Sequence, residues 1–264
     1  MHNMYHKKSV AAFSLVELSI VLVILGLLTG GILGGQSLIR AAELRSLTTE
    51  SQRFTTAVRT FQDKYFAMPG DMTNATAFWG KSAADCNAQT GAAATPGTCN
   101  GNGDGVITYP VAAGGTGEAF RGWQHLALAG LIEGTYTGNA GSISASDPDA
   151  GINVPASRLK SGVWGYGYFD NTAPVTNYAF NYNMSNWMSV GTEGDNAYAD
   201  GPLLRPEEAW NVDTKLDDGR PGTGRVLATN AAACTNAAGA TSRNADYRLA
   251  ESGLLCSLAM QTMN

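Results

Sequence analysis

The sequence predicts an α+β protein in which one long N-terminal helix packs against an antiparallel sheet. The helix is indicated by an apolar run near the N-terminus that passes, without a proline, into a stretch with helical spacing of apolar residues. The sheet is indicated by a later stretch, 163–169, in which aromatic residues alternate with smaller ones as they do along a strand. Much of the remaining chain is rich in loop-forming glycine, asparagine and threonine.

The apolar run is long enough to cross a bilayer as a helix. Between Ala11 and Leu33 it is interrupted only by Ser14, Glu17, Ser19 and Thr29, and about 20 apolar residues suffice for a membrane span. Behind it, one helical face recurs at steps of three and four residues: Leu44, Leu47, Ser51, Phe54, Val58, Phe61 and Tyr65. The opposite, polar face is expected to carry Arg40, Glu43, Arg45, Glu50, Arg53, Arg59, Asp63 and Lys64. We therefore predict one helix over 13–66, with a membrane part at 13–35 and an amphipathic part at 36–66, ended by Pro69 and Gly70.

A single carboxylate, that of Glu17, stands near the start of the apolar run. Because a charge inside a membrane segment costs free energy, Glu17 is a candidate functional residue. A secretory signal peptide is an alternative, with cleavage at the small residues 29–31, but its apolar region is normally about 7 to 15 residues long. A plain membrane anchor would explain the length of the run but not the carboxylate.

The stretch Ala12-Phe13-Ser14-Leu15-Val16-Glu17-Leu18, after a short basic leader, resembles the processing site of type IV pilins and type II secretion pseudopilins. The family usually has glycine before the cut, where this chain has Ala12. The resemblance implies that residues 1–12 are a leader and that prepilin peptidase cuts before Phe13 and methylates the new amine. It also implies that Glu17, the fifth residue of the processed chain, helps subunits to join a helical filament.

The same resemblance implies a location, partners and a function. Residues 67–264 would form a loop-rich, pilin-like globular domain in the periplasm, held by one span in the bacterial inner membrane until the subunit enters an extracytoplasmic filament. The implied partners are membrane lipid, the peptidase, the inner-membrane assembly platform and other pilin-like subunits in a homo- or hetero-polymer. We expect a structural subunit of a type IV pilus or a type II secretion pseudopilus. The alternative is a minor tip, adhesin or DNA-uptake subunit of such a filament.

Composition argues against two other classes of function. The formal net charge is −5 and only 15% of residues are charged, which does not favour a broad nucleic-acid surface. The chain has three histidines, of which His2 and His6 belong to the expected leader, and it has no recognisable nucleotide-binding or hydrolase motif. We therefore expect no enzymatic activity.

The four cysteines are grouped in two pairs that are close in sequence. Four cysteines permit three pairings, and we favour Cys86–Cys99 with Cys234–Cys256, because short loops close at the least entropic cost. Free buried thiols are the alternative, which an exported protein makes less favourable.

A candidate calcium site lies in the stretch from Asn100 to Ile107, which follows the first half of an EF-hand-type loop. The expected ligands are oxygen atoms of Asn100, Asn102, Asp104, Val106 and Glu118. Position 1 of the loop is an asparagine and position 12 is Val111, so any Ca²⁺ would bind weakly and serve the fold. The alternative is a cluster of tight Asn-Gly and Asp-Gly turns without metal.

Four further segments are expected to be regular. Helical spacing indicates helices over 118–132 and 206–216, and in the first of these His125 is expected to be a half-buried packing residue. Strands are expected at 178–184, as the hairpin partner of 163–169, and at 225–228. Between the second helix and the last strand, the acidic turn around Asp217 and Asp218 is either a second cation site or a turn held by side-chain hydrogen bonds.

Overall fold

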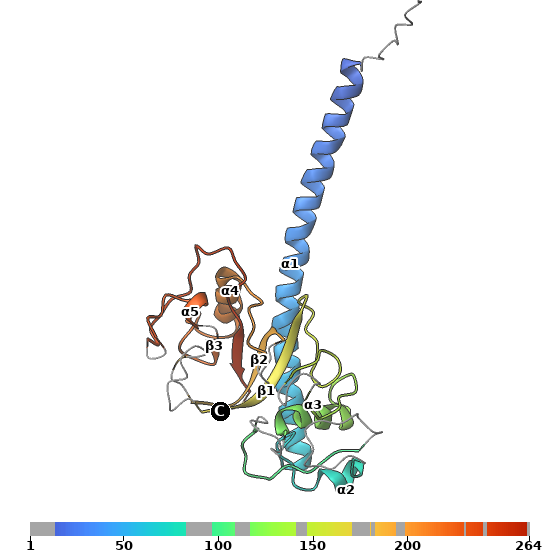
Figure 1. Cartoon of the computed structure of the whole chain (residues 1–264), viewed down its shortest axis with the longest axis vertical. Coiled ribbons are helices and arrows are strands. Elements are labelled where there is room, and N and C mark those ends of the chain that lie inside the picture. The colour runs from blue at the N-terminus through green and yellow to red at the C-terminus, as the bar shows by residue number, and fades with distance from the viewer. Residues whose placement is uncertain are drawn as a thin grey trace, which may run out of the picture. The chain divides into compact units, whose positions relative to one another are not determined.

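The fold is α+β, as predicted, with a long N-terminal helix packed on a four-stranded antiparallel sheet. The computed structural model describes residues 14–82, 97–108, 117–140, 147–170, 180, 183–193, 199–229, 231–239 and 242–262. Within them the elements, labelled in Figure 1, are α1 (Leu15–Tyr65), α2 (Ala75–Trp79), α3 (Glu118–Leu128), β1 (Gly162–Asp170), β2 (Asn183–Thr192), α4 (Pro206–Leu216), β3 (Val226–Ala228), α5 (Ala231–Cys234) and β4 (Leu258–Gln261).

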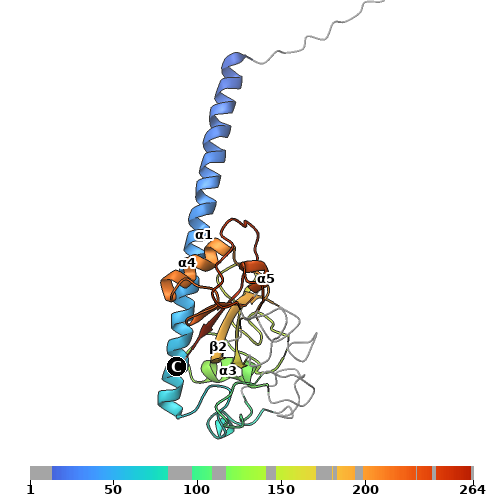
Figure 2. The same cartoon turned by 90° about the vertical axis from the view of Figure 1, so that its left-hand side faces the viewer.

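The chain divides into two compact units, 1–43 and 44–264. Helix α1 is continuous over 51 residues and contributes to both of them. The second unit therefore contains the last part of α1 together with the whole sheet. Figures 1 and 2 show β1 and β2 beside this part of α1, and α3 close to its C-terminal end.

The face of α1 that was expected to be apolar packs into the core of the second unit. Leu47, Phe54, Val58 and Phe61 are each at most 1% exposed. The ring of Phe54 meets those of Trp123 and Trp164 edge-on, at centroid distances of 5.0 and 5.3 Å. Full burial of such a side chain contributes about 1.5–3 kcal/mol, so this stripe is a main source of stability for the second unit.

Glu50 was expected on the polar face of α1, and this expectation is wrong. Its side chain is buried and accepts hydrogen bonds from Trp164 Nε1 at 3.1 Å, Ser157 Oγ at 2.9 Å and the backbone N–H of Arg158 at 3.0 Å. These donors come from β1 and from the segment before it, so one carboxylate ties α1 to the sheet.

The sheet has the strand order β1-β2-β4-β3, and every neighbouring pair is antiparallel. Strand β1 pairs with β2 in the register Trp164↔Val190 and Tyr166↔Met188. The hairpin partner therefore begins at Asn183, later than the expected 178–184 segment, of which only residues 180, 183 and 184 are described. Alternation alone could not distinguish these two neighbouring apolar stretches, because both have the period of a strand. The expected strand at 225–228 and helix at 206–216 are confirmed as β3 and α4, which pack against each other.

The turn after α1 is fixed by its contacts with α3. Gly70 has φ +95°, and a Cβ there would collide with the carbonyl oxygen of Glu118, so the position requires glycine. The Gly70 N–H donates to His125 Nδ1 at 2.9 Å, while His125 Nε2 lies 3.0 Å from Thr98 Oγ1. Burial lowers the pKa of His125 to about 3, so the ring is neutral at physiological pH. His125 is thus a packing residue, as predicted, although it is fully rather than half buried.

The predicted Cys234–Cys256 disulfide is confirmed, with its Cα atoms 4.9 Å apart. It joins α5 to the segment that leads into β4. Cys99 is also disulfide-bonded. The partner expected for it, Cys86, lies outside the described residues.

Candidate functional site

The first candidate surface is the N-terminal part of α1. Every residue from Ser14 to Gly34 is exposed. An 18-residue window of the helix has a mean hydropathy of 2.4 with none of it buried, so α1 is long and apolar enough to cross a membrane. Among its large side chains, Leu15 is 84% exposed and Leu27 is 73% exposed.

Glu17 is the one acidic residue in the exposed apolar part of α1, between Ser14 and Gly34. Its carboxylate accepts a hydrogen bond from the Ser14 N–H at 2.9 Å, in the first turn of the helix. A carboxylate in this place satisfies a backbone donor that the helix itself cannot satisfy. The two residues expected to flank the cleavage, Ala12 and Phe13, lie outside the described residues.

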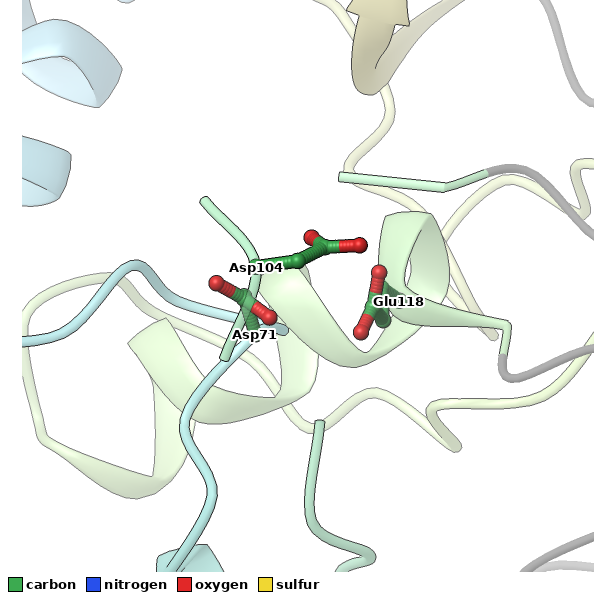
Figure 3. A group of neighbouring side chains, drawn as sticks. All are labelled: Asp71, Asp104 and Glu118. Carbon is green, nitrogen blue, oxygen red and sulfur yellow. The ribbon is translucent and has the colours of Figure 1, made fainter. Parts of the chain in front are cut away.

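The second candidate site is a group of three carboxylates from separate parts of the second unit. Asp71 lies in the turn after α1, Asp104 lies in the loop that was expected to bind calcium, and Glu118 is the first residue of α3. One oxygen from each lies within 4.8 Å of the others, and the three side chains face a common space in Figure 3. Asp71 is 4% exposed and Glu118 is fully buried, whereas Asp104 is exposed.

The loop between Asn102 and Thr108 wraps around these carboxylates through its own donors. Asp71 accepts from the N–H groups of Gly103 at 2.5 Å and Gly105 at 2.8 Å. Glu118 accepts from the N–H of Asn102 at 3.1 Å and from the N–H and hydroxyl of Thr108 at 3.0 and 2.7 Å. The carboxylates therefore hold the loop in place, and the loop in turn fixes the positions of their oxygens.

Burial sets the electrostatics of this group. It raises the pKa of Asp71 and that of Glu118, although the backbone donors oppose the effect. The negative charge of Asp104 also raises the pKa of Asp71, and that of Asp71 raises the pKa of Glu118. The nearby guanidinium of Arg121 is buried and donates to the carbonyl of Asn100 at 3.1 Å. Among the described residues, three carboxylates lie near the guanidinium of Arg121, so negative charge is in excess.

The five expected calcium ligands have different places in the structure. Asp104 and Glu118 do meet, and Asn102 lies between them, donating from its amide to Asp104 Oδ2 at 2.8 Å. The Val106 N–H donates to Asp104 Oδ1 at 2.8 Å. Asn100 has another role, because its amide oxygen accepts from the Thr76 N–H at 2.8 Å, at the start of α2.

Asp71 was missed by the sequence reasoning. It follows Pro69-Gly70, which was interpreted only as the end of the helix. No local pattern marks it as a partner of a loop some 30 residues later. One feature of the sequence could have indicated Asp71: its carboxylate comes directly after a turn that must bring the chain back to the domain.

A further acidic group, Asp213, Asp217 and Asp218, occupies the turn after α4. Asp213 is fully buried and accepts from the Tyr247 hydroxyl at 2.8 Å, and burial raises the pKa of Asp213 to about 7. Asp217 accepts from the backbone N–H groups of Arg225 and Val226, and Asp218 accepts from the N–H of Arg220 at 2.8 Å. These side chains hold a turn, which is one of the two alternatives that the sequence left open.

No protein-family model, curated protein or solved structure matches this chain. Its function is therefore inferred from the exposed apolar part of α1 and from the sequence around Phe13.

Proposed function

We propose that this protein is a structural subunit of a filament of the type IV pilus or type II secretion pseudopilus kind, without enzymatic activity. The observation that carries the proposal is the continuous exposure of the apolar residues between Ser14 and Gly34 on a helix whose later part is a core element of the second unit. The pilin-like processing sequence around Phe13 supports the same function.

An exposed helix of this composition is expected to be buried against lipid or other protein. Burying the exposed part of a leucine or isoleucine side chain contributes about 1 kcal/mol or more, so the helix is unfavourable in water. A lipid bilayer covers it before assembly, and the equivalent helices of neighbouring subunits cover it in the filament. On this proposal the unassembled subunit is a single-pass protein of the inner membrane, with the second unit in the periplasm.

Glu17 supplies specificity to an otherwise uniform apolar surface. After prepilin peptidase removes residues 1–12, the new amine of Phe13 carries a positive charge. In the filament, the Glu17 carboxylate of one subunit neutralises the Phe13 amine of the next. An unpaired charge in an apolar core is costly, so this pairing sets the axial position of each subunit as it leaves the assembly platform.

The test combines mass spectrometry with filament incorporation. The mass of the native protein should show cleavage before Phe13 and one added methyl group. Glu17→Ala should be processed but absent from sheared filaments. Glu43→Ala is the matched control, since this acid on the same helix pairs with Arg40 at 3.1 Å within the chain and should be dispensable. Normal incorporation of the Glu17→Ala chain would refute the proposal.

A minor tip or ligand-binding subunit of such a filament is the second candidate. It is favoured by two exposed aromatic side chains near the C-terminal end of α1, Phe66 at 93% and Phe78 at 56% exposed. Abundance separates the two functions, because a shaft subunit forms the bulk of sheared filaments whereas a tip subunit is a trace component.

A further inference from the structure

We propose that Asp71, Asp104 and Glu118 bind one Ca²⁺ ion that fastens the 100–108 loop to the end of α1 and the start of α3. Asp71 replaces Asn100 in the ligand set expected from the loop sequence (Figure 3). The inference goes beyond filament assembly and does not depend on it.

The geometry suits a calcium ion. Calcium binds oxygen ligands at about 2.3–2.6 Å, so oxygens on opposite sides of one ion lie roughly 5 Å apart. The three carboxylates each offer an oxygen within 4.8 Å of the other two. Each carboxylate has about four lone-pair sites, so the backbone hydrogen bonds that fix these oxygens leave others for the ion. The exposed side of Asp104 gives water access to complete the coordination shell.

A second observation concerns a side chain that is not an acid. The hydroxyl of Tyr166, on β1, is buried and has no hydrogen-bond partner among the described residues. Its ring lies against Gly122, one turn along α3 from Glu118. A Cβ on Gly122 would also lie 3.3 Å from the carbonyl oxygen of Pro69, two residues before Asp71, so the Tyr166 ring lies beside the turn that carries this acid. The charges of Asp71 and Glu118 both raise the pKa of this phenol. Buried hydroxyls are nearly always paired, and a water molecule bound to the ion is a partner for this one.

The charges favour a cation at the same place. Two buried carboxylates and one exposed carboxylate lie together near the buried guanidinium of Arg121. Clustered acids of this kind stabilise a fold only when a proton or a cation offsets their repulsion. The donor set contains oxygen alone, which favours a hard cation over one that prefers thiolate or imidazole ligands.

The experiment uses the full-length protein in detergent micelles, freed of metal with a chelator and titrated with CaCl₂ or MgCl₂. Calorimetry and the thermal midpoint are the two readouts. We expect Ca²⁺ to bind with a Kd of roughly 10⁻⁴ to 10⁻³ M and to raise the midpoint, with a smaller effect of Mg²⁺, because Mg²⁺ needs shorter distances and gives up its water reluctantly.

Three variants locate the site. Asp104→Asn changes an exposed side chain and should fold, yet bind Ca²⁺ more than about tenfold more weakly. Tyr166→Phe should weaken binding severalfold, since it removes only the hydroxyl. Asp217→Asn, in the acidic turn after α4, is the control and should retain the wild-type Kd.

The proposal is overturned if millimolar Ca²⁺ neither binds nor shifts the midpoint of the wild-type chain. It is overturned equally if Asp104→Asn keeps the full calcium response, or if Asp217→Asn loses it. An unchanged Kd in Tyr166→Phe would refute the link between the hydroxyl and the ion, and an equal response to Mg²⁺ would refute the assignment of calcium.

Discussion

Replacing Glu50 by alanine should destabilise the second unit by about 3 kcal/mol. The substitution removes the acceptor of three hydrogen bonds, from Trp164, Ser157 and Arg158. Ser157 is half-buried and Arg158 is exposed, so their donors can turn to water at a cost of about 0.5–1.5 kcal/mol for each lost bond. The Trp164 side chain is fully buried, and an unsatisfied N–H there costs about 1–3 kcal/mol.

Thermal unfolding of the full-length protein in micelles, followed by circular dichroism, measures this effect. For a unit of this size, about 3 kcal/mol corresponds to a fall in Tm of roughly 6–12 °C. Glu50→Gln should lie between wild type and Glu50→Ala, because the amide keeps one acceptor oxygen. Asp63→Ala is the control, as an exposed acid on the same helix. A Glu50→Ala midpoint equal to that of Asp63→Ala would show that the carboxylate does not join helix and sheet.

Three further predictions concern the second unit. A fragment that starts at Leu44 should be folded by circular dichroism, whereas one that starts at Ala67 should not, because it lacks four fully buried side chains of α1 that contribute at least about 6 kcal/mol together. Replacing Cys234 and Cys256 by alanine should lower the free energy of unfolding by about 3 kcal/mol in urea titrations, since the bridge closes a loop with a sequence separation of 22. The pKa of Asp213 is raised to about 7 from 3.8, so the folded state retains a proton that the unfolded state releases, and stability should fall between about pH 4 and pH 7. Asp213→Asn should abolish that part of the pH dependence, and an unchanged slope would contradict the raised pKa.

Periodicity predicted the elements that bury one continuous face. The stripe through Leu47, Phe54 and Phe61 was identified because helical spacing repeats over several turns. The same spacing also contained the position that was missed. Glu50 is three residues after Leu47 and four before Phe54, so it lies on the buried face, and its charge led to its assignment to the polar one. A buried carboxylate is recognisable only with its donors, which here lie more than 100 residues away.

Of the three clustered acids, two could be predicted from the sequence and one could not. Asp104 belongs to a local loop pattern, and Glu118 was suggested as a more distant ligand, so both could be identified from the sequence. Asp71 joins them because Gly70 packs closely against α3, a contact that no local pattern records. Ala12 and Phe13, the two residues expected at the cleavage point, lie outside the described residues, so their prediction depends on the sequence alone.

The neutral ring of His125 gives a simple nitrogen NMR signal for the turn after α1. Its Nδ1 accepts the Gly70 N–H, so the ring proton resides on Nε2 and one tautomer is fixed. His2 and His6 precede the proposed cleavage, so the processed chain would carry a single imidazole. One pair of ring resonances, assignable without mutagenesis, would then report whether the turn after α1 remains docked on α3, both in the isolated subunit and, by solid-state measurements, in the proposed filaments.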